Sequence, residues 1–144
     1  MVEPYTLSDA IRIGATLRPQ TFNSWFFNGR SCAMGAAIEA LTGEFCDTID
    51  MVARERLEVL EDRLHRRYQP VLKQRLQCSD CRFREREFLS DLIIHLNDTH
   101  KWTREKIADF VQSVEEQIGY VTLSESTADA VTAGESQFTR LAIR

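Results

Sequence analysis

Apolar residues that recur at three- and four-residue intervals predict helices along most of this chain. The first helix begins at Thr6, because a threonine N-cap with an acid three residues later, Asp9, is a variant of the capping box. Pro19 ends it near Arg18, since the residue before a proline is disfavoured in the helical conformation. The apolar positions between these limits are Leu7, Ala10, Ile11, Gly14 and Leu17.

A group of large aromatic residues follows, closed by the turn pair Asn28-Gly29. Because such side chains are costly to leave in water, we expect them in the core rather than in an exposed docking patch. The group consists of Phe22, Trp25, Phe26 and Phe27.

Residues 31–41 predict a second helix, which Gly43 stops. Its many small side chains allow other helices to approach closely, which favours a central, buried position. Cys32 has no basic neighbour except Arg30, so we expect it to be buried and inert rather than reactive. The spacing of Cys46 leaves open whether it is a metal ligand.

The longest helix is predicted over residues 48–68, where dense Arg and Glu residues surround one apolar stripe. Pro70 interrupts this helix, and residues 71–76 continue as a short strand or a further helical turn. The stripe consists of Ala53, Leu57, Leu60 and Leu64.

Two more helices are predicted towards the C-terminus. One spans residues 84–97, and the other begins after the N-cap Thr103, with Trp102 and Ile107 placed as a hydrophobic staple. The predicted core positions of the first are Phe88, Leu89, Leu92, Ile93 and Leu96, and those of the second are Ile107, Phe110, Val111, Val114 and Ile118.

These patterns predict a mainly α fold, a small domain of about five helices over residues 1–120. Residues 121–144 are rich in Ser, Thr, Ala and acids, which predicts a weakly ordered tail. The apolar positions Phe138, Leu141 and Ile143 allow its end to dock as a short strand or peptide.

The composition, 43% apolar and 28% charged, is typical of globular proteins. The first residues show no basic segment followed by an apolar one, so no signal peptide is expected. No apolar run approaches the roughly 20 residues needed to cross a bilayer. We therefore expect a cytoplasmic protein that has reduced cysteines and does not bind membranes.

Four potential metal ligands follow the spacing C-x2-C-x13-H-x4-H: Cys78, Cys81, His95 and His100. Zn²⁺ takes thiolate and neutral imidazole ligands in tetrahedral sites, and a C-x2-C turn directs both sulfurs to one ion. The spacing therefore predicts a zinc site, the alternative being two reduced cysteines and two surface histidines. Four protein ligands leave no open coordination position, which favours a structural over a catalytic role.

Over residues 78–100 the spacing resembles the C2H2 zinc fingers of nucleic-acid-binding proteins. Two features depart from that pattern: Arg86 lies where the family has a core phenylalanine, and the segment between Cys81 and His95 is one residue longer than usual. We interpret the motif as a finger-like site within a larger domain rather than as an autonomous DNA-reading finger.

Another resemblance rests on the segments 29–37, 95–98 and 103–108. With Cys32-Ala33-Met34-Gly35-Ala36 and Asn97-Asp98, the chain resembles a group of small uncharacterised bacterial and phage proteins that share a C-A-x-G-A helix and an N-D turn before an amphipathic helix. The resemblance implies a bacterial or phage origin and an all-helical fold. The cysteine pair of the metal motif is not part of this shared pattern.

Charge is unevenly distributed, although the net charge is only −4. Residues 63–86 contain eight basic side chains against two acids, Asp80 and Glu85. Such a stretch indicates either an anionic partner or a solvated helix face. The basic residues are Arg63, Arg66, Arg67, Lys73, Arg75, Arg82, Arg84 and Arg86.

Three functions fit these patterns. We expect a non-enzymatic, zinc-stabilised module that binds another protein. The alternative is nucleic-acid binding through the basic residues within 63–86, with the metal holding the arginines near the cysteines in place. The third is a metalloenzyme, which requires an open metal position and a general base from among Glu85, Glu87, Asp91 and Asp98.

Overall fold

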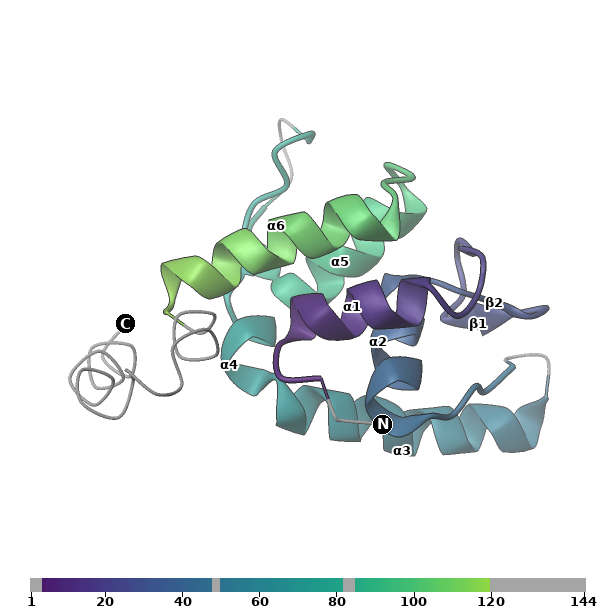
Figure 1. Ribbon diagram of the computed structural model, residues 1–144. Helices are drawn as coiled ribbons and strands as arrows, with labels where there is room; N and C mark the ends of the chain where they lie inside the picture. The colour runs from purple at the N-terminus through teal and green to yellow at the C-terminus, as the bar shows by residue number, and fades with distance from the viewer. Residues whose placement is uncertain (1–3, 48–49, 82–84, 120–144) are drawn as a thin grey trace, which may run out of the picture.

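The computed structural model describes residues 4–47, 50–81 and 85–119, and the fold of these residues is mainly helical, as predicted. The helices pack around a hydrophobic core, and two short hairpins are attached to them (Figure 1). In chain order the elements are α1 (Leu7–Ala15), β1 (Phe26–Phe27), β2 (Arg30–Ser31), α2 (Ala33–Thr42), α3 (Met51–Arg67), α4 (Gln69–Leu72), β3 (Arg75–Leu76), β4 (Glu87–Phe88), α5 (Leu89–Asp98) and α6 (Arg104–Gln117).

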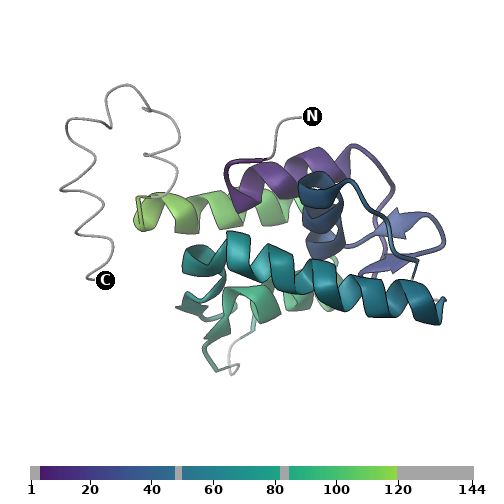
Figure 2. The same cartoon turned by 90° about the horizontal axis from the view of Figure 1, so that it is seen from below.

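The central helix is α2, as its small residues predicted. Every residue from Ala33 to Leu41 is buried, and α1, α3 and α5 all contact this helix. Cys32 caps its first turn, and Gly43 ends it with a φ of 76°, in the left-handed region that favours glycine. The long helix α3 lies along the lower edge of Figure 1 and faces the viewer in Figure 2.

At Gly14, α1 and α2 approach so closely that no side chain fits between them. A Cβ atom on Gly14 would lie 1.9 Å from the carbonyl oxygen of Ala36, a backbone atom that cannot swing aside. Gly14 is therefore required by the packing of one helix on another.

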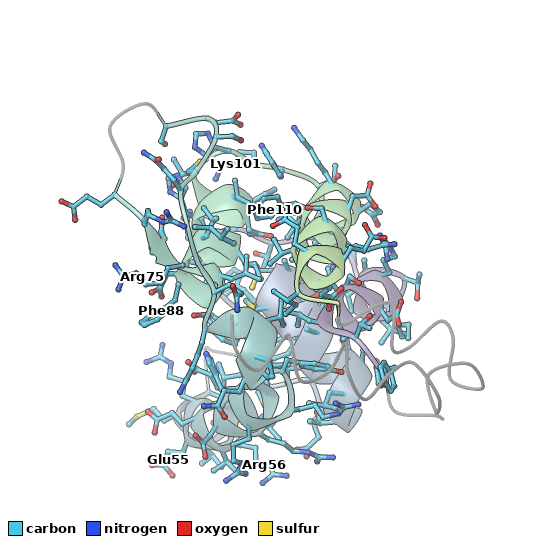
Figure 3. The ribbon with its side chains drawn as sticks, turned by 90° about the vertical axis from the view of Figure 1, so that its left-hand side faces the viewer. Glu55, Arg56, Arg75, Phe88, Lys101 and Phe110 are labelled. Atoms are coloured by element: carbon cyan, nitrogen blue, oxygen red, sulfur yellow. The ribbon has the colours of Figure 1, made fainter. Side chains whose placement is uncertain are left out.

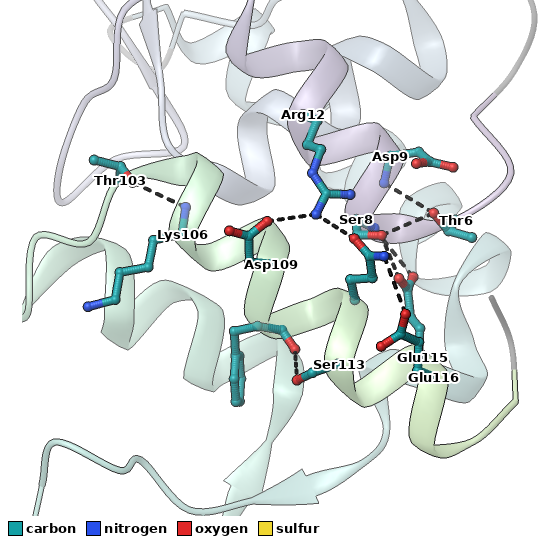
Figure 4. A network of polar contacts seen from close by, with 12 residues as sticks. Thr6, Ser8, Asp9, Arg12, Thr103, Lys106, Asp109, Ser113, Glu115 and Glu116 are labelled. Carbon is teal, nitrogen blue, oxygen red and sulfur yellow. Dashed lines mark hydrogen bonds and ion pairs between the residues drawn. The ribbon is translucent and has the colours of Figure 1, made fainter.

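A buried carboxylate joins the first helix to the last. Glu115 of α6 has no exposed surface, and it accepts a hydrogen bond from the Leu7 amide at 2.9 Å. It accepts another from the Ser8 hydroxyl at 2.6 Å (Figure 4). These bonds supplement the predicted N-cap, in which the Thr6 hydroxyl accepts the amide of Asp9. Burial raises the pKa of Glu115, even though its hydrogen bonds act in the opposite direction.

The predicted aromatic group lies only partly in the core, so that prediction needs correction. Phe26 is fully buried and Trp25 partly buried, but Phe22 and Phe27 are 36% and 43% exposed. The hairpin of β1 and β2 explains the difference between Phe26 and Phe27, because successive residues of a strand face opposite sides. Its turn is the predicted Asn28-Gly29 pair, in which both residues have a positive φ.

Three predicted helix limits and one predicted core residue are wrong. α2 begins at Ala33 rather than Ser31, because Ser31 pairs with β1 in the strand β2. α1 ends at Ala15 rather than near Arg18. α5 begins at Leu89 rather than Arg84, because the residues just before it pair with β3 as the strand β4. Phe88 lies in that strand and is 45% exposed, although its spacing predicted a core position.

The patterns of the other helices are confirmed. The stripe on α3 faces the core, with Leu57, Leu60 and Leu64 buried. Thr103 caps α6 by accepting the amide of Lys106 at 3.1 Å. The side chains of α6 that are buried as predicted are Ile107, Val111 and Val114.

The predicted tail, residues 121–144 with Phe138, Leu141 and Ile143, lies outside the described residues. The single domain over residues 1–120 stays a prediction. Among the residues that the structure describes, no helix is both long and apolar enough to cross a membrane.

Gly14→Ala is expected to lower the free energy of unfolding by about 2 to 3 kcal/mol, because the added methyl group forces α1 and α2 apart. Urea unfolding followed by circular dichroism measures the loss. In the matched control, Gly29→Ala, the methyl group enters open space, so only the strain of a positive φ remains, about 1 kcal/mol. Equal losses in the two variants would contradict the close-approach explanation.

Candidate metal centre

The four predicted metal ligands converge at one point of the structure. The ligand atoms of Cys78, Cys81, His95 and His100 all lie within 4.8 Å of one another. The Cys81 sulfur lies 3.2 Å from Nε2 of His95 and 3.1 Å from Nε2 of His100, and the two Nε2 atoms are 3.1 Å apart. This group could bind a metal ion.

Two local turns bring these side chains together. The cysteines follow β3, and the Cys81 amide donates to the Cys78 carbonyl at 3.3 Å, which closes the C-x2-C turn. His95 lies in the last turn of α5, and the amides of Thr99 and His100 both donate to its carbonyl. His100 is thereby folded back, so that its ring meets that of His95 edge-on, with centroids 4.7 Å apart.

The distances fit a tetrahedral ion. With metal–sulfur and metal–nitrogen bonds of about 2.3 and 2.0 Å, ligand atoms at the corners of a tetrahedron lie roughly 3.3 to 3.8 Å apart. The separations of 3.1 and 3.2 Å therefore need to expand by only a few tenths of an ångström. The donor set of two sulfurs and two imidazole nitrogens differs from the oxygen ligands that the hard ions Mg²⁺ and Ca²⁺ prefer.

The centre lies at the edge of the core. Cys78 and His95 are buried, at 3% and 7% exposure, whereas Cys81 and His100 are half-buried. Leu92, one helical turn before His95, is also buried, so packed apolar side chains of α5 lie next to the centre. Such surroundings hold the imidazole in place and would keep water away from one side of a bound ion.

Asn97 fastens the ligand-bearing end of α5 to the rest of the fold. Its Oδ1 accepts the Ala33 amide at 3.1 Å and Nε2 of Gln20 at 2.9 Å, and its Nδ2 donates to the Thr21 carbonyl at 3.0 Å. The next residue, Asp98, accepts the amide of Asn23 at 2.9 Å. The sequence placed Asn97 only in a polar helix exit, because none of the distant partners is visible in a local pattern.

Trp102 connects the cysteine turn to the start of α6. Its Nε1 donates to Asp80, between the two cysteines, at 3.1 Å. Its backbone amide donates to the Leu96 carbonyl at 3.1 Å, and Nζ of Lys106 lies 4.0 Å from the centre of its ring. The metal centre is thus bordered by contacts from α5, α6 and the β3–β4 hairpin.

The order strand, cysteine turn, strand, helix is that of a zinc finger, but the helix is used differently. α5 packs into the core, with Leu89, Leu92, Ile93 and Leu96 buried. Its one exposed position is Asp91, whose carboxylate repels phosphate. This helix therefore cannot enter a DNA groove as a finger helix does.

The predicted basic residues that the structure describes are spread over α3, the end of α4 and the β3–β4 hairpin. Arg66 pairs with Asp62 at 3.3 Å, and Arg67 donates to the carbonyls of Pro4 and Tyr5. The exposed cations of this stretch are Arg63, Arg66, Lys73, Arg75 and Arg86, whereas Arg82 and Arg84 lie outside the described residues. Arg75 and Arg86 are the two that share contacts, because each donates to the backbone carbonyl of the other.

The chain matches no protein-family model, no curated protein and no solved structure. Its function is therefore argued from the geometry of the site. The resemblances to zinc fingers and to small bacterial and phage proteins stay predictions.

The structure separates the cysteines into two chemical classes. Cys32 and Cys46 are each 4% exposed, and burial raises the pKa of both thiols, that of Cys32 to about 12. This confirms that Cys32 is buried, and it leaves Cys46 outside the cluster of four ligands. Because the thiolate is the reactive form, neither thiol is suited to react in the folded protein.

In the metal-loaded protein, none of the thiols is expected to react with Ellman's reagent. A chelator should make Cys81, which is half-buried, reactive, and also Cys78, because the cysteine turn loosens when no ion joins it to the histidines. Cys32 and Cys46 lie away from that turn and should respond only after denaturant is added. Absorbance of the released thiolate counts the groups in each step. A double variant, Cys32→Ser with Cys46→Ser, is the control and should keep the full chelator-dependent step. Loss of that step in the variant would contradict the assignment.

Proposed function

We propose that this chain is a non-enzymatic, zinc-stabilised helical protein whose role is to bind another protein. The observation that carries the zinc assignment is the convergence of two cysteine sulfurs and two histidine nitrogens within 4.8 Å. Thiolate and imidazole together suit Zn²⁺ in the reducing cytoplasm that we expect for this protein of bacterial or phage origin.

A structural role for the ion follows from what surrounds it. Bound zinc would join the cysteine turn to the end of α5. Asn97 already holds that end of α5 against α2. Zinc would fix the cysteine turn beside β3 and β4, because paired strands of only two residues each give little stability on their own.

Chemistry at the ion is disfavoured because four protein ligands fill a tetrahedral shell. Glu87, Asp91 and Asp98 line a hollow beside His95, so three of the candidate general bases do lie near the centre. Without an open coordination position, however, they have no activated water to deprotonate. We therefore propose that the protein is not an enzyme.

The face of α3 that points away from the core supports a protein partner. Met51, Val52 and Val59 are 74%, 73% and 55% exposed, whereas the opposite stripe of the helix is buried. Exposed apolar side chains grouped on one helix, with charged residues between them, are typical of helix-docking surfaces. Nucleic-acid binding is the alternative, and the contacts between Arg75 and Arg86 favour it.

The purified protein is expected to contain zinc in an equimolar amount, measured by elemental analysis. His100→Ala should lose the ion and melt at a lower temperature, because zinc at a thousand times its dissociation constant stabilises the folded state by about 4 kcal/mol. His65→Ala is the matched control, since this histidine lies on α3 and is not among the clustered ligands. A metal-free wild-type protein whose melting is unaffected by chelator would refute the zinc assignment.

A partner that docks on α3 should be lost from the double variant Val52→Glu with Val59→Glu. Proteins retained by the immobilised wild type are compared with those retained by this variant, and the interaction is then reconstituted from purified components. The control is Leu17→Glu, which changes another exposed apolar residue on a different part of the surface. A partner that binds all three equally would exclude α3 as the docking surface.

A further inference from the structure

Two guanidinium groups and an exposed aromatic ring lie together on the β3–β4 hairpin. Arg75 and Phe88 are directly opposite each other in the ladder, and the Arg75 guanidinium lies 5.4 Å from the centre of the ring (Figure 3). Arg86 joins them, because its Nη2 donates to the Arg75 carbonyl at 3.0 Å, and Nη2 of Arg75 donates to the Arg86 carbonyl at 3.3 Å.

These positive charges are held in place but not neutralised. Both arginines are exposed, and neither forms an ion pair with a carboxylate in the described parts of the chain. Glu87 is the neighbour of Phe88 in β4, so it faces the opposite side of the hairpin, where it lines the hollow beside His95. Two like charges held on the paired strands of one short hairpin repel each other, and an anion that binds both reduces this repulsion.

Phe88 adds a flat apolar surface that the core does not use. It is 45% exposed, although the adjacent Leu89 is fully buried. Any of the nucleobases can stack on such a ring, and a phosphate accepts hydrogen bonds from guanidinium groups. In a duplex the faces of the bases are already stacked, so an unpaired strand is the ligand that offers both groups at once.

We propose that this face of the hairpin, formed by Arg75, Arg86 and Phe88, binds single-stranded nucleic acid. The arginines hold a phosphate, and the ring stacks on an unpaired base. The site lies on the hairpin, apart from the α3 surface proposed for a protein partner, and it deepens the nucleic-acid alternative by naming an unpaired strand as the ligand. The hairpin site and the α3 surface have in common only the zinc-stabilised fold, in which the cysteine turn follows β3.

Binding is measured by fluorescence anisotropy with the zinc-loaded full chain and labelled oligouridylate, oligothymidylate or a duplex of equal length. Both single strands should bind more tightly than the duplex, and binding should weaken as salt is raised. Comparison of the two single strands tells whether RNA or DNA is preferred. The double variant Arg75→Gln with Arg86→Gln, and separately Phe88→Leu, should each lower the affinity roughly tenfold or more. Phe88→Trp should retain binding, because the stacking surface is preserved.

The β1–β2 hairpin provides a matched control. There Phe27 lies directly opposite Arg30, and both are exposed. The turn between them is Asn28-Gly29, so this hairpin itself supplies no second arginine. The double variant Phe27→Leu with Arg30→Gln should therefore bind as the wild type does. Circular dichroism and zinc content of each variant distinguish a lost site from a lost fold.

Four results would overturn the proposal: no binding at any salt, duplex bound as tightly as single strands, an unchanged affinity in Phe88→Leu, or an equal loss in the control variant. Polyglutamate that binds as tightly as the oligonucleotides would assign the arginines to an acidic protein instead. If any of these results is obtained with a protein that contains its full zinc content, only the hairpin proposal is refuted. A wild-type protein without zinc would refute the structural zinc role, whatever the binding result.

Discussion

The fully buried amide of Asn97 is the contact on which the metal centre and the central helix both depend. It bonds to the start of α2 through Ala33 and to the preceding loop through Gln20 and Thr21. An unpaired polar group at such a position costs about 1 to 3 kcal/mol, so the surrounding loop is held to one conformation. Since His95 and His100 lie on either side of Asn97 in the chain, a bound ion and this amide fix the same turn from two directions.

Local patterns predicted most of the helices and all four clustered ligands. The Thr6 and Thr103 caps were predictable because each satisfies an amide three residues away. The metal ligands were predictable for a related reason, since the C-x2-C turn and the interval from His95 to His100 are short and chemically distinctive. The shape of the centre could be anticipated without knowledge of the remaining fold.

Contacts between distant residues were not predictable in this way. Arg104 is 5% exposed and donates to the carbonyls of Ser31 and Arg18, although a charged residue in the first turn of an amphipathic helix indicates a solvent position. Phe88 shows the converse case. Its helical spacing predicted burial, but two residues of strand pairing with β3 turned it outward.

The bonds from the first helix to Glu115 also bear on the order in which the protein folds. The Ser8 hydroxyl and its carboxylate acceptor are 107 positions apart in the chain. During synthesis α1 emerges before α6, which carries its buried acceptor. Such a long loop must close before the contact forms, so α1 completes its packing late, although it is made early. Until α6 has been made, the start of α1 therefore lacks its buried acceptor, although its close contact with α2 at Gly14 can already form.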